Sequence, residues 1–308
     1  MSGHDVRLYK DDFSGATTIT YRESLPREFA PLLVLDASGS LRLTYELWEK
    51  GRGNLVDLFS PPKTYTNLTI HHWDHAAGKM AQQDEVKAET LAEGASKAID
   101  QTSNDEQVLI IIRKQEDPSH PSLEQLIMAK VRDGGRDPTR LSFLTWGKHT
   151  ATNEFADVKH VIVVGALQYS YAQNEAMARA AGGLSVQAPV RTQEVEQVRL
   201  GEIAHHLFQA VGRGAVRKSV EGGCPPGCHL WIALSSHGKA PIPVELLLTT
   251  FPGSRLEKWL PVEPPLKKNE ASVVEAVGLS WRQSRGHGQC CRPSCPSRMF
   301  VEHGHPQT

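Results

Sequence analysis

The sequence predicts an α/β fold in which helices flank a mostly parallel sheet. Two short runs, Val108–Ile112 and Val158–Val164, are apolar and rich in β-branched residues, as expected of strands that are buried on both faces. Other segments have apolar residues at helical spacing, and the longest covers 194–212. Strands that alternate with helices in this way imply βαβ units and therefore a parallel sheet.

The remaining elements follow from the same two patterns. Further strands are expected at Leu32–Asp36, Asn67–Ile70, Leu141–Trp146 and His229–Leu234, and further helices at Glu85–Asp100, Ser122–Arg132 and Val244–Phe251. The pattern divides the chain into a less regular part (1–104), a regular domain (105–250), an extension (251–280) and a tail (281–308). Because the tail has almost no apolar periodicity, it is predicted to be disordered.

Composition limits the classes of partner. The 308 residues have a formal net charge of -1, so any binding to nucleic acid must come from a local basic patch. The N-terminal residues have no apolar core of a signal peptide, and no apolar run approaches the roughly 20 residues of a membrane span. The sequence therefore predicts a soluble, cytoplasmic protein that makes no membrane contact.

Neither group of metal-binding residue types is interpreted as a metal site. Cys224 and Cys228 have a spacing that zinc ligands use, but no clean second cysteine pair accompanies them, and we interpret them as loop cysteines. His71–His75 contains three histidines and an aspartate; we interpret it as a polar strand end with a packed tryptophan. The prediction is that the chain has no metal site.

The strongest chemical signal lies at the end of the longest helix. Gln209, Gly212, Arg213 and Arg217 follow one another over nine residues with small residues between them. Two arginines on a small-residue turn can face one anion, because the planar guanidinium donates two parallel hydrogen bonds to a phosphate. The alternative is a basic helix C-terminus that interacts favourably with the helix dipole.

A second signal precedes the strand that ends at Val164. The loop from Thr150 to Asp157 contains Asn153 and Asp157, and polar residues in such a loop often face a ligand. The alternative is an ordinary loop in which the Asn and Asp side chains form local turns.

Taken in order, the two signals resemble motif V and motif VI of superfamily 2 nucleic-acid helicases. The loop has the pattern T-x-N-x-F-x-D, and the helix ends in Q-x-x-G-R with another arginine beyond it. Two earlier segments fit the same order, since Val34–Ser38 resembles motif III and Val108–Arg113 resembles the strand of motif IV. The resemblance covers about residues 30–235 and implies a RecA-like C-terminal helicase domain, preceded by part of a first RecA-like domain.

The resemblance implies specific roles. Arg213 and Arg217 would be arginine fingers that stabilise the γ-phosphate of ATP during transfer, with Gln209 and Gly212 beside them. Asn153 and Asp157 would couple the nucleotide to the nucleic-acid strand. Asp36 and Ser38 would relay between the two domains.

The implied cofactors are ATP and Mg²⁺, and the implied partner is single- or double-stranded DNA, with RNA as the other option. A role in the replication of a phage or mobile element is implied by the resemblance alone.

The chain departs from the family in two ways. The two arginines are separated by three residues instead of the commoner two, which rotates the second side chain by about 100° on a continuous helix. More importantly, no G-x-x-x-x-G-K-[ST] phosphate loop is present, because Gly78–Lys79, Gly147–Lys148 and Gly238–Lys239 are not followed by Ser or Thr. No apolar strand ends in a D-E-x-H or D-E-x-D box. ATP and Mg²⁺ would therefore need a domain that supplies these motifs.

The sequence is compatible with three functions. The chain is the C-terminal part of a helicase, or it is a truncated, non-catalytic remnant that acts as a binding module or is inactive. In the third, a separate partner chain with the Walker motifs completes a split enzyme, and Arg213 acts on that chain's nucleotide.

Overall fold

The computed structural model describes residues 6–10, 17–21, 31–58, 63–115, 119–148 and 153–262. Residues 1–262 form one compact unit. The predicted tail (281–308), most of the predicted extension and the loop residues 149–152 lie outside the described part of the chain.

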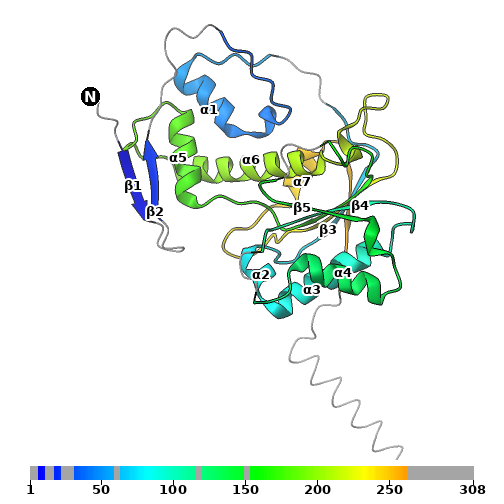
Figure 1. Ribbon diagram of the computed structural model, residues 1–308. Coiled ribbons are helices and arrows are strands. Elements are labelled where there is room, and N and C mark those ends of the chain that lie inside the picture. The colour runs from blue at the N-terminus through cyan, green and yellow to red at the C-terminus, as the bar shows by residue number, and fades with distance from the viewer. Residues whose placement is uncertain are drawn as a thin grey trace, which may run out of the picture. The chain divides into compact units, whose positions relative to one another are not determined.

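The centre of the unit is a six-stranded, entirely parallel sheet with the order β5-β4-β6-β7-β3-β8 (Figure 1). The strands are β3 (Leu68–Trp73), β4 (Val108–Ile112), β5 (Leu141–Thr145), β6 (His160–Val164), β7 (Cys228–Ala233) and β8 (Arg255–Lys258). The prediction of an α/β fold with a parallel sheet is confirmed, and the architecture is consistent with a RecA-like domain. The sheet includes β3 and β8, so it is wider than the predicted range of 105–250.

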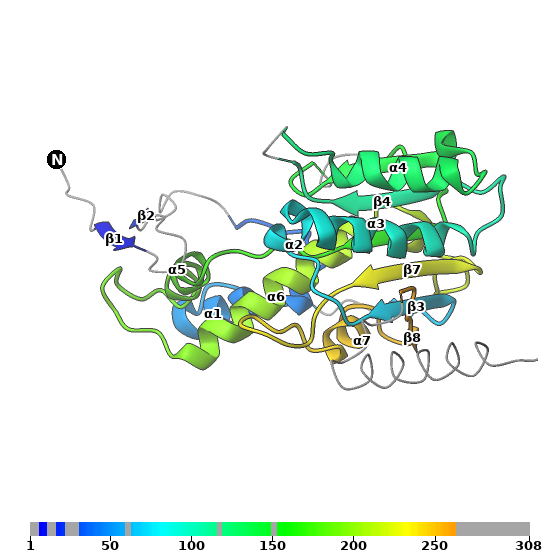
Figure 2. The same cartoon turned by 90° about the horizontal axis from the view of Figure 1, so that it is seen from below.

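Helices cover both faces of this sheet (Figure 2). One face packs against α3 (Glu85–Ile99) and α4 (Leu123–Asp133), and the other against α6 (Thr192–Val211) and α7 (Glu245–Thr250). In β4, alternate residues face opposite layers: Leu109 and Ile111 face α6, and Ile110 and Ile112 face α3 and α4. The strand is fully buried because both faces are covered, which is why its sequence is an uninterrupted apolar run.

The remaining elements lie outside the sheet. They are the hairpin β1 (Val6–Lys10) and β2 (Thr17–Tyr21), the helices α1 (Leu43–Arg52), α2 (Lys79–Gln83) and α5 (Tyr171–Ala181), and the 3₁₀ turns η1 (Gly39–Leu41), η2 (Pro138–Arg140) and η3 (Ala215–Arg217). In Figure 1 the hairpin lies beside α5, and α1 lies beside α5 and α6.

The prediction of a buried strand at Leu32–Asp36 is wrong. The segment is not a strand, and Leu33 and Leu35 are 71% and 88% exposed. An apolar run predicts that a segment would be stable inside a sheet, but it does not supply the neighbouring strands. Among the described residues, no strand pairs with this segment.

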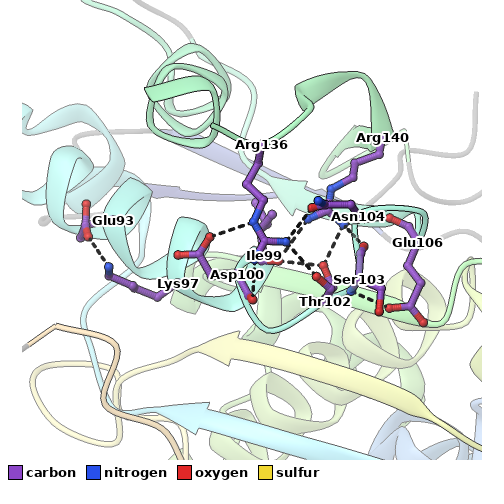
Figure 3. A network of polar contacts seen from close by, with 10 residues as sticks. All are labelled: Glu93, Lys97, Ile99, Asp100, Thr102, Ser103, Asn104, Glu106, Arg136 and Arg140. Atoms are coloured by element: carbon purple, nitrogen blue, oxygen red, sulfur yellow. Dashed lines mark hydrogen bonds and ion pairs between the residues drawn. The ribbon is translucent and has the colours of Figure 1, made fainter. Parts of the chain in front are cut away.

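Two arginines close the C-terminal end of α3 (Figure 3). The Arg140 guanidinium is buried and donates to the carbonyls of Ile99, Ser103 and Glu106 and to the Thr102 hydroxyl, at 2.8–3.1 Å. Arg136 donates to the carbonyl of Asp100 at 2.9 Å. These bonds reach the Ile99 and Asp100 carbonyls at the helix end and the Ser103 and Glu106 carbonyls beyond it, and they fix the turn that leads into β4.

Candidate functional site

The two segments that resemble motifs V and VI lie together at the amino ends of β6 and β7. Arg217 Nη1 donates to Asn153 Oδ1 at 2.7 Å, and Lys218 forms an ion pair with Asp157. The backbone N–H of Ala215 donates to the carbonyl of Val158 at 2.8 Å, which holds one segment against the other. Residues about 60 positions apart in sequence therefore share one surface.

Arg213 is directed back along its own helix. Its Nε donates to the Gln209 carbonyl at 3.2 Å and its Nη2 donates to Gln209 Oε1 at 3.1 Å. Burial, and then the neighbouring Arg217 charge, lower the pKa of Arg213 from its ordinary value. The positive charge is thus less favourable here than in water, and an anion placed beside it would relieve that cost.

α6 ends before Arg217, so the extra residue between the two arginines does not rotate the Arg217 side chain about the helix axis. α6 stops at Val211, Gly212 caps it with an ordinary negative φ, and Arg217 lies in the separate 3₁₀ turn η3. A Cβ on Gly214 would lie 2.7 Å from the Val158 carbonyl, so the small residue between the two arginines permits the close contact of the segments.

Sequence reasoning missed two lysines of this site. Lys218 follows Arg217 directly, and this basic pair was visible in the sequence. Lys63 precedes β3, and its Nζ donates to the carbonyls of Val216 at 2.7 Å and Lys218 at 2.6 Å. Nothing near Lys63 in sequence indicates that role, because η3 and Lys63 meet only in the fold. We call Lys63, Asn153, Asp157, Gln209, Arg213, Arg217 and Lys218 the arginine cluster.

The arginine cluster suits the binding of an anion better than the transfer of a proton. Hydrogen bonding to Lys218 and its charge lower the pKa of the exposed Asp157 carboxyl, so it is a poor general base. Arg217 is exposed and presents a planar donor. Such donors can stabilise charge on a phosphate.

Asp36 and Ser38 precede η1 and lie against a different part of α6. Asp36 Oδ1 accepts from the Ser38 hydroxyl at 2.6 Å, and that hydroxyl contacts His205 Nδ1 at 2.6 Å. Arg42 donates to both oxygens of the buried Glu202 carboxylate, at 2.8 and 3.1 Å. His205 lies eight residues before Arg213, about 12 Å along the helix, so the structure does not bring Asp36 and Ser38 into the arginine cluster.

The carboxyl edge of the sheet is closed where β4 and β6 adjoin. The connections that follow these strands cross to opposite faces, and in α/β sheets ligands commonly bind at such a point. Here Gln82 Nε2 donates to the carbonyls of Val164 at 2.9 Å and Ala77 at 2.8 Å, and Gln82 Oε1 accepts from the N–H of Arg113. Gln82 therefore bridges the carboxyl ends of β4 and β6.

A cavity of about 250 Å³ lies beside Gln82, between the starts of α3 and α4. Its lining includes the basic residues Lys79, Arg113 and Lys114, together with acidic residues of α3. The three basic side chains are matched in number by Asp84, Glu85 and Glu89, so the lining has no excess of positive charge.

The two groups weighed as metal ligands have other contacts. The prediction that Cys224 and Cys228 are both loop cysteines is wrong for Cys228, which begins β7. Both residues are buried free thiols, and burial raises the pKa of Cys228 to about 12, so the thiol is protonated at neutral pH. His75 stacks on Trp73, with ring centroids 4.2 Å apart. Among the described residues, no three His, Cys, Asp or Glu side chains are grouped to hold a metal ion.

No helix in the described part of the chain is both long enough and apolar enough to cross a membrane. No protein family model matches the sequence, and no curated protein matches it.

Proposed function

We propose that the chain is the C-terminal, RecA-like part of an ATP-dependent nucleic-acid helicase or translocase of superfamily 2. In this proposal Arg213 and Arg217 stabilise the γ-phosphate of an ATP–Mg²⁺ complex that another domain holds. The principal support is the contact between the two motif-like segments, in which Arg217 meets Asn153 at 2.7 Å. The order of the motif-like segments in the sequence adds to it.

The location of the charges also supports the proposal that another domain holds ATP while this chain supplies the arginines. The basic side chains of the arginine cluster lie at the amino edge, while at the carboxyl edge Gln82 bonds to the backbone of Val164 and Arg113. The sequence has no phosphate loop, so the nucleotide would be bound by a partner domain and met by this edge. Arg213 would leave its contacts with Gln209 and donate to the phosphate instead.

The test is ATP hydrolysis by the chain together with a polypeptide that contains a G-x-x-x-x-G-K-[ST] motif, encoded by a neighbouring open reading frame. The Arg213→Ala variant should lose roughly 10³-fold or more in turnover, as expected when an arginine finger is removed. Arg191→Ala is the matched control, because Arg191 lies at the start of the same helix with its side chain 85% exposed. Equal activity of wild type and Arg213→Ala would reject the role.

The nucleic-acid part of the proposal has a separate candidate contact in Arg113 and Lys114, which follow β4 and line one side of the cavity beside Gln82. The double variant Arg113→Ala, Lys114→Ala should weaken binding of single-stranded DNA and lower the slope of log K against log salt by about 0.7 per lost phosphate contact. Arg132→Ala, at the exposed end of α4, should leave the slope unchanged. Fluorescence anisotropy at several salt concentrations measures both, and an unchanged slope in the double variant would exclude this contact.

The second candidate function is a non-catalytic binding module, and the missing phosphate loop favours it for the isolated chain. The two candidates differ in one result. A binding module would bind DNA but would not gain ATP turnover when any chain with Walker motifs is added.

A further inference from the structure

Three histidines form a row across the sheet, one from each of three adjacent strands. His160 begins β6, His229 is the second residue of β7, and His71 lies in β3. Each lies two residues before a side chain that packs against α3 and α4, so all three rings are on that face of the sheet. His71 Nε2 and His229 Nδ1 are 3.0 Å apart, and the rings of His229 and His160 stack with centroids 5.6 Å apart.

A carboxylate stands at each end of this histidine row. Glu257 of β8 lies 3.3 Å from His71 Nδ1, and Glu106, before β4, lies 3.0 Å from His160 Nε2. Figure 3 shows Glu106 at the end of the turn that Arg140 holds, and its carboxylate also accepts from the Ser103 N–H at 2.9 Å. Polar contacts therefore link Glu257, His71 and His229 at one end and His160 and Glu106 at the other, and the two parts meet through the stacked rings of His229 and His160.

The charges around the row oppose full protonation. Burial lowers the pKa of His71, as do the charges of His229 and of Arg255 in β8, while Glu257 raises it. Burial also lowers the pKa of His229, as do His160 and Arg255, while Glu257 and Glu106 raise it. One charge can be shared with the flanking carboxylates, but two adjacent imidazolium ions would repel each other.

The hydrogen bonds follow from the same geometry. When both rings are neutral, His71 Nδ1–H donates to Glu257, and His71 Nε2 accepts from His229 Nδ1–H. A proton added at His71 Nε2 makes that nitrogen a donor, so the proton of His229 must move from Nδ1 to Nε2 for the bond to persist. A second proton, on His229 Nδ1, would place two N–H donors 3.0 Å apart.

We propose that the histidine row is an acid-operated switch, which accepts one proton with the row intact and separates His71 from His229 when the second proton binds. The row adjoins the arginine cluster, because the His229 N–H donates to the Lys159 carbonyl at 3.0 Å and the preceding Val158 carbonyl accepts from Ala215. Opening of the row should therefore displace the loop that contains Arg217. The proton steps do not depend on the proposed ATPase role.

The test is a histidine titration of the full chain from pH 8 to pH 4.5, followed by long-range ¹H–¹⁵N NMR. His71 and His229 should show two macroscopic midpoints more than about one pH unit apart, as coupled groups do. The ¹⁵N shifts of His229 should report the change from Nδ1–H to Nε2–H at the first midpoint. Independent titration of both rings near about pH 6.5, without a tautomer change, would overturn the proposal.

Variants and fluorescence sharpen the test. Trp231 stacks on His71 and His229, with centroids 5.0 and 5.3 Å away, so its emission should change at the second midpoint and the change should vanish in Trp231→Phe. His229→Asn keeps a hydrogen-bonding atom near the Nδ1 position but takes no proton, so His71 should then titrate once. His237→Gln, whose side chain is 82% exposed outside the row, should keep both midpoints. Two midpoints in His229→Asn would contradict the assignment, and if that variant does not fold, the wild-type titration decides.

Discussion

The two edges of the sheet use polar side chains in different ways. At the carboxyl edge, the Gln82 side-chain amide donates to the backbone carbonyls of Ala77 and Val164 and so holds two neighbouring segments together. At the amino edge, Arg217 and Lys218 remain exposed beside Asn153 and Asp157. The backbone bonds of the Gln82 amide stabilise the fold, whereas the exposed cations at the amino edge can exchange their present partners for an external anion.

The largest effect is expected where the carboxyl edge is most crowded. Gly165 has a φ of 74°, and a Cβ there would lie 2.1 Å from the Ala77 carbonyl. Gly165→Ala should lower the free energy of unfolding by about 3 kcal/mol or more, because the new atom forces the two segments apart. Gly135→Ala is matched in φ (73°) but meets no atom within 4 Å, so it should cost only about 1–2 kcal/mol. Urea unfolding of both variants measures the difference, and equal losses would refute the crowding argument.

Removal of the closing side chain should have a smaller effect. Gln82→Leu keeps the volume but leaves the Val164 carbonyl and the Arg113 N–H without this partner, which should cost about 2 kcal/mol. The neighbouring, exposed Gln83 provides the control, since Gln83→Leu should change the free energy of unfolding by less than about 0.5 kcal/mol. If the two variants unfold at the same urea concentration, Gln82 does not close the edge.

As the pH falls, the amino edge of the sheet should lose stability before the carboxyl edge does. The pKa values of His71 and His229 are lowered in the folded state, so their contribution to stability is present above about pH 6.5 and is lost as the pH falls through the lowered values. At the carboxyl edge, burial raises the pKa of Asp74, but the Ser236 hydrogen bonds outweigh it and lower the pKa below 3.8. That contribution is present above pH 3.8 and is lost only below it. The protection factors of backbone amides, which correct for the intrinsic pH dependence of exchange, should therefore fall first around His71 and His229 between pH 7.5 and 5.5. An equal fall at both edges would contradict this order.

The smallest effect on stability is expected for Arg217→Ala. The side chain is exposed, and its bond to Asn153 should contribute less than about 1 kcal/mol. The variant should unfold at nearly the wild-type urea concentration but lose affinity for inorganic pyrophosphate, which isothermal titration calorimetry measures. Unchanged pyrophosphate affinity would mean that Arg217 does not face the anion.

The strands that are buried on both faces were predictable from sequence, and the polar arrangements were not. Val108–Ile112 is uninterrupted and β-branched because helices cover both of its faces. The similar run at Leu32–Asp36 is exposed and is not a strand, since apolar character does not reveal whether neighbouring strands exist. β8 was missed because this short edge strand, Arg255–Lys258, has no apolar run.

In the candidate site, only contacts between residues close in sequence could be derived from the sequence pattern. Gln209 and Arg213 are four residues apart on one helix, so their contact follows from helical geometry. The contact of Arg217 with Asn153 was suggested by the resemblance, whereas that of Lys63 with η3 depends on strand order. The histidine row has the same origin, because its three residues become neighbours only when β6, β7 and β3 pair.

The most direct test of the central claim is ATP binding and hydrolysis by the purified chain, with and without single-stranded DNA, in wild type and Arg213→Ala. We expect neither micromolar binding of ATP nor turnover, because the proposed function assigns the nucleotide to another domain and leaves this chain without a phosphate loop. Turnover by the isolated wild-type chain that Arg213→Ala abolishes would contradict it and would mean that the chain itself contains a complete nucleotide site.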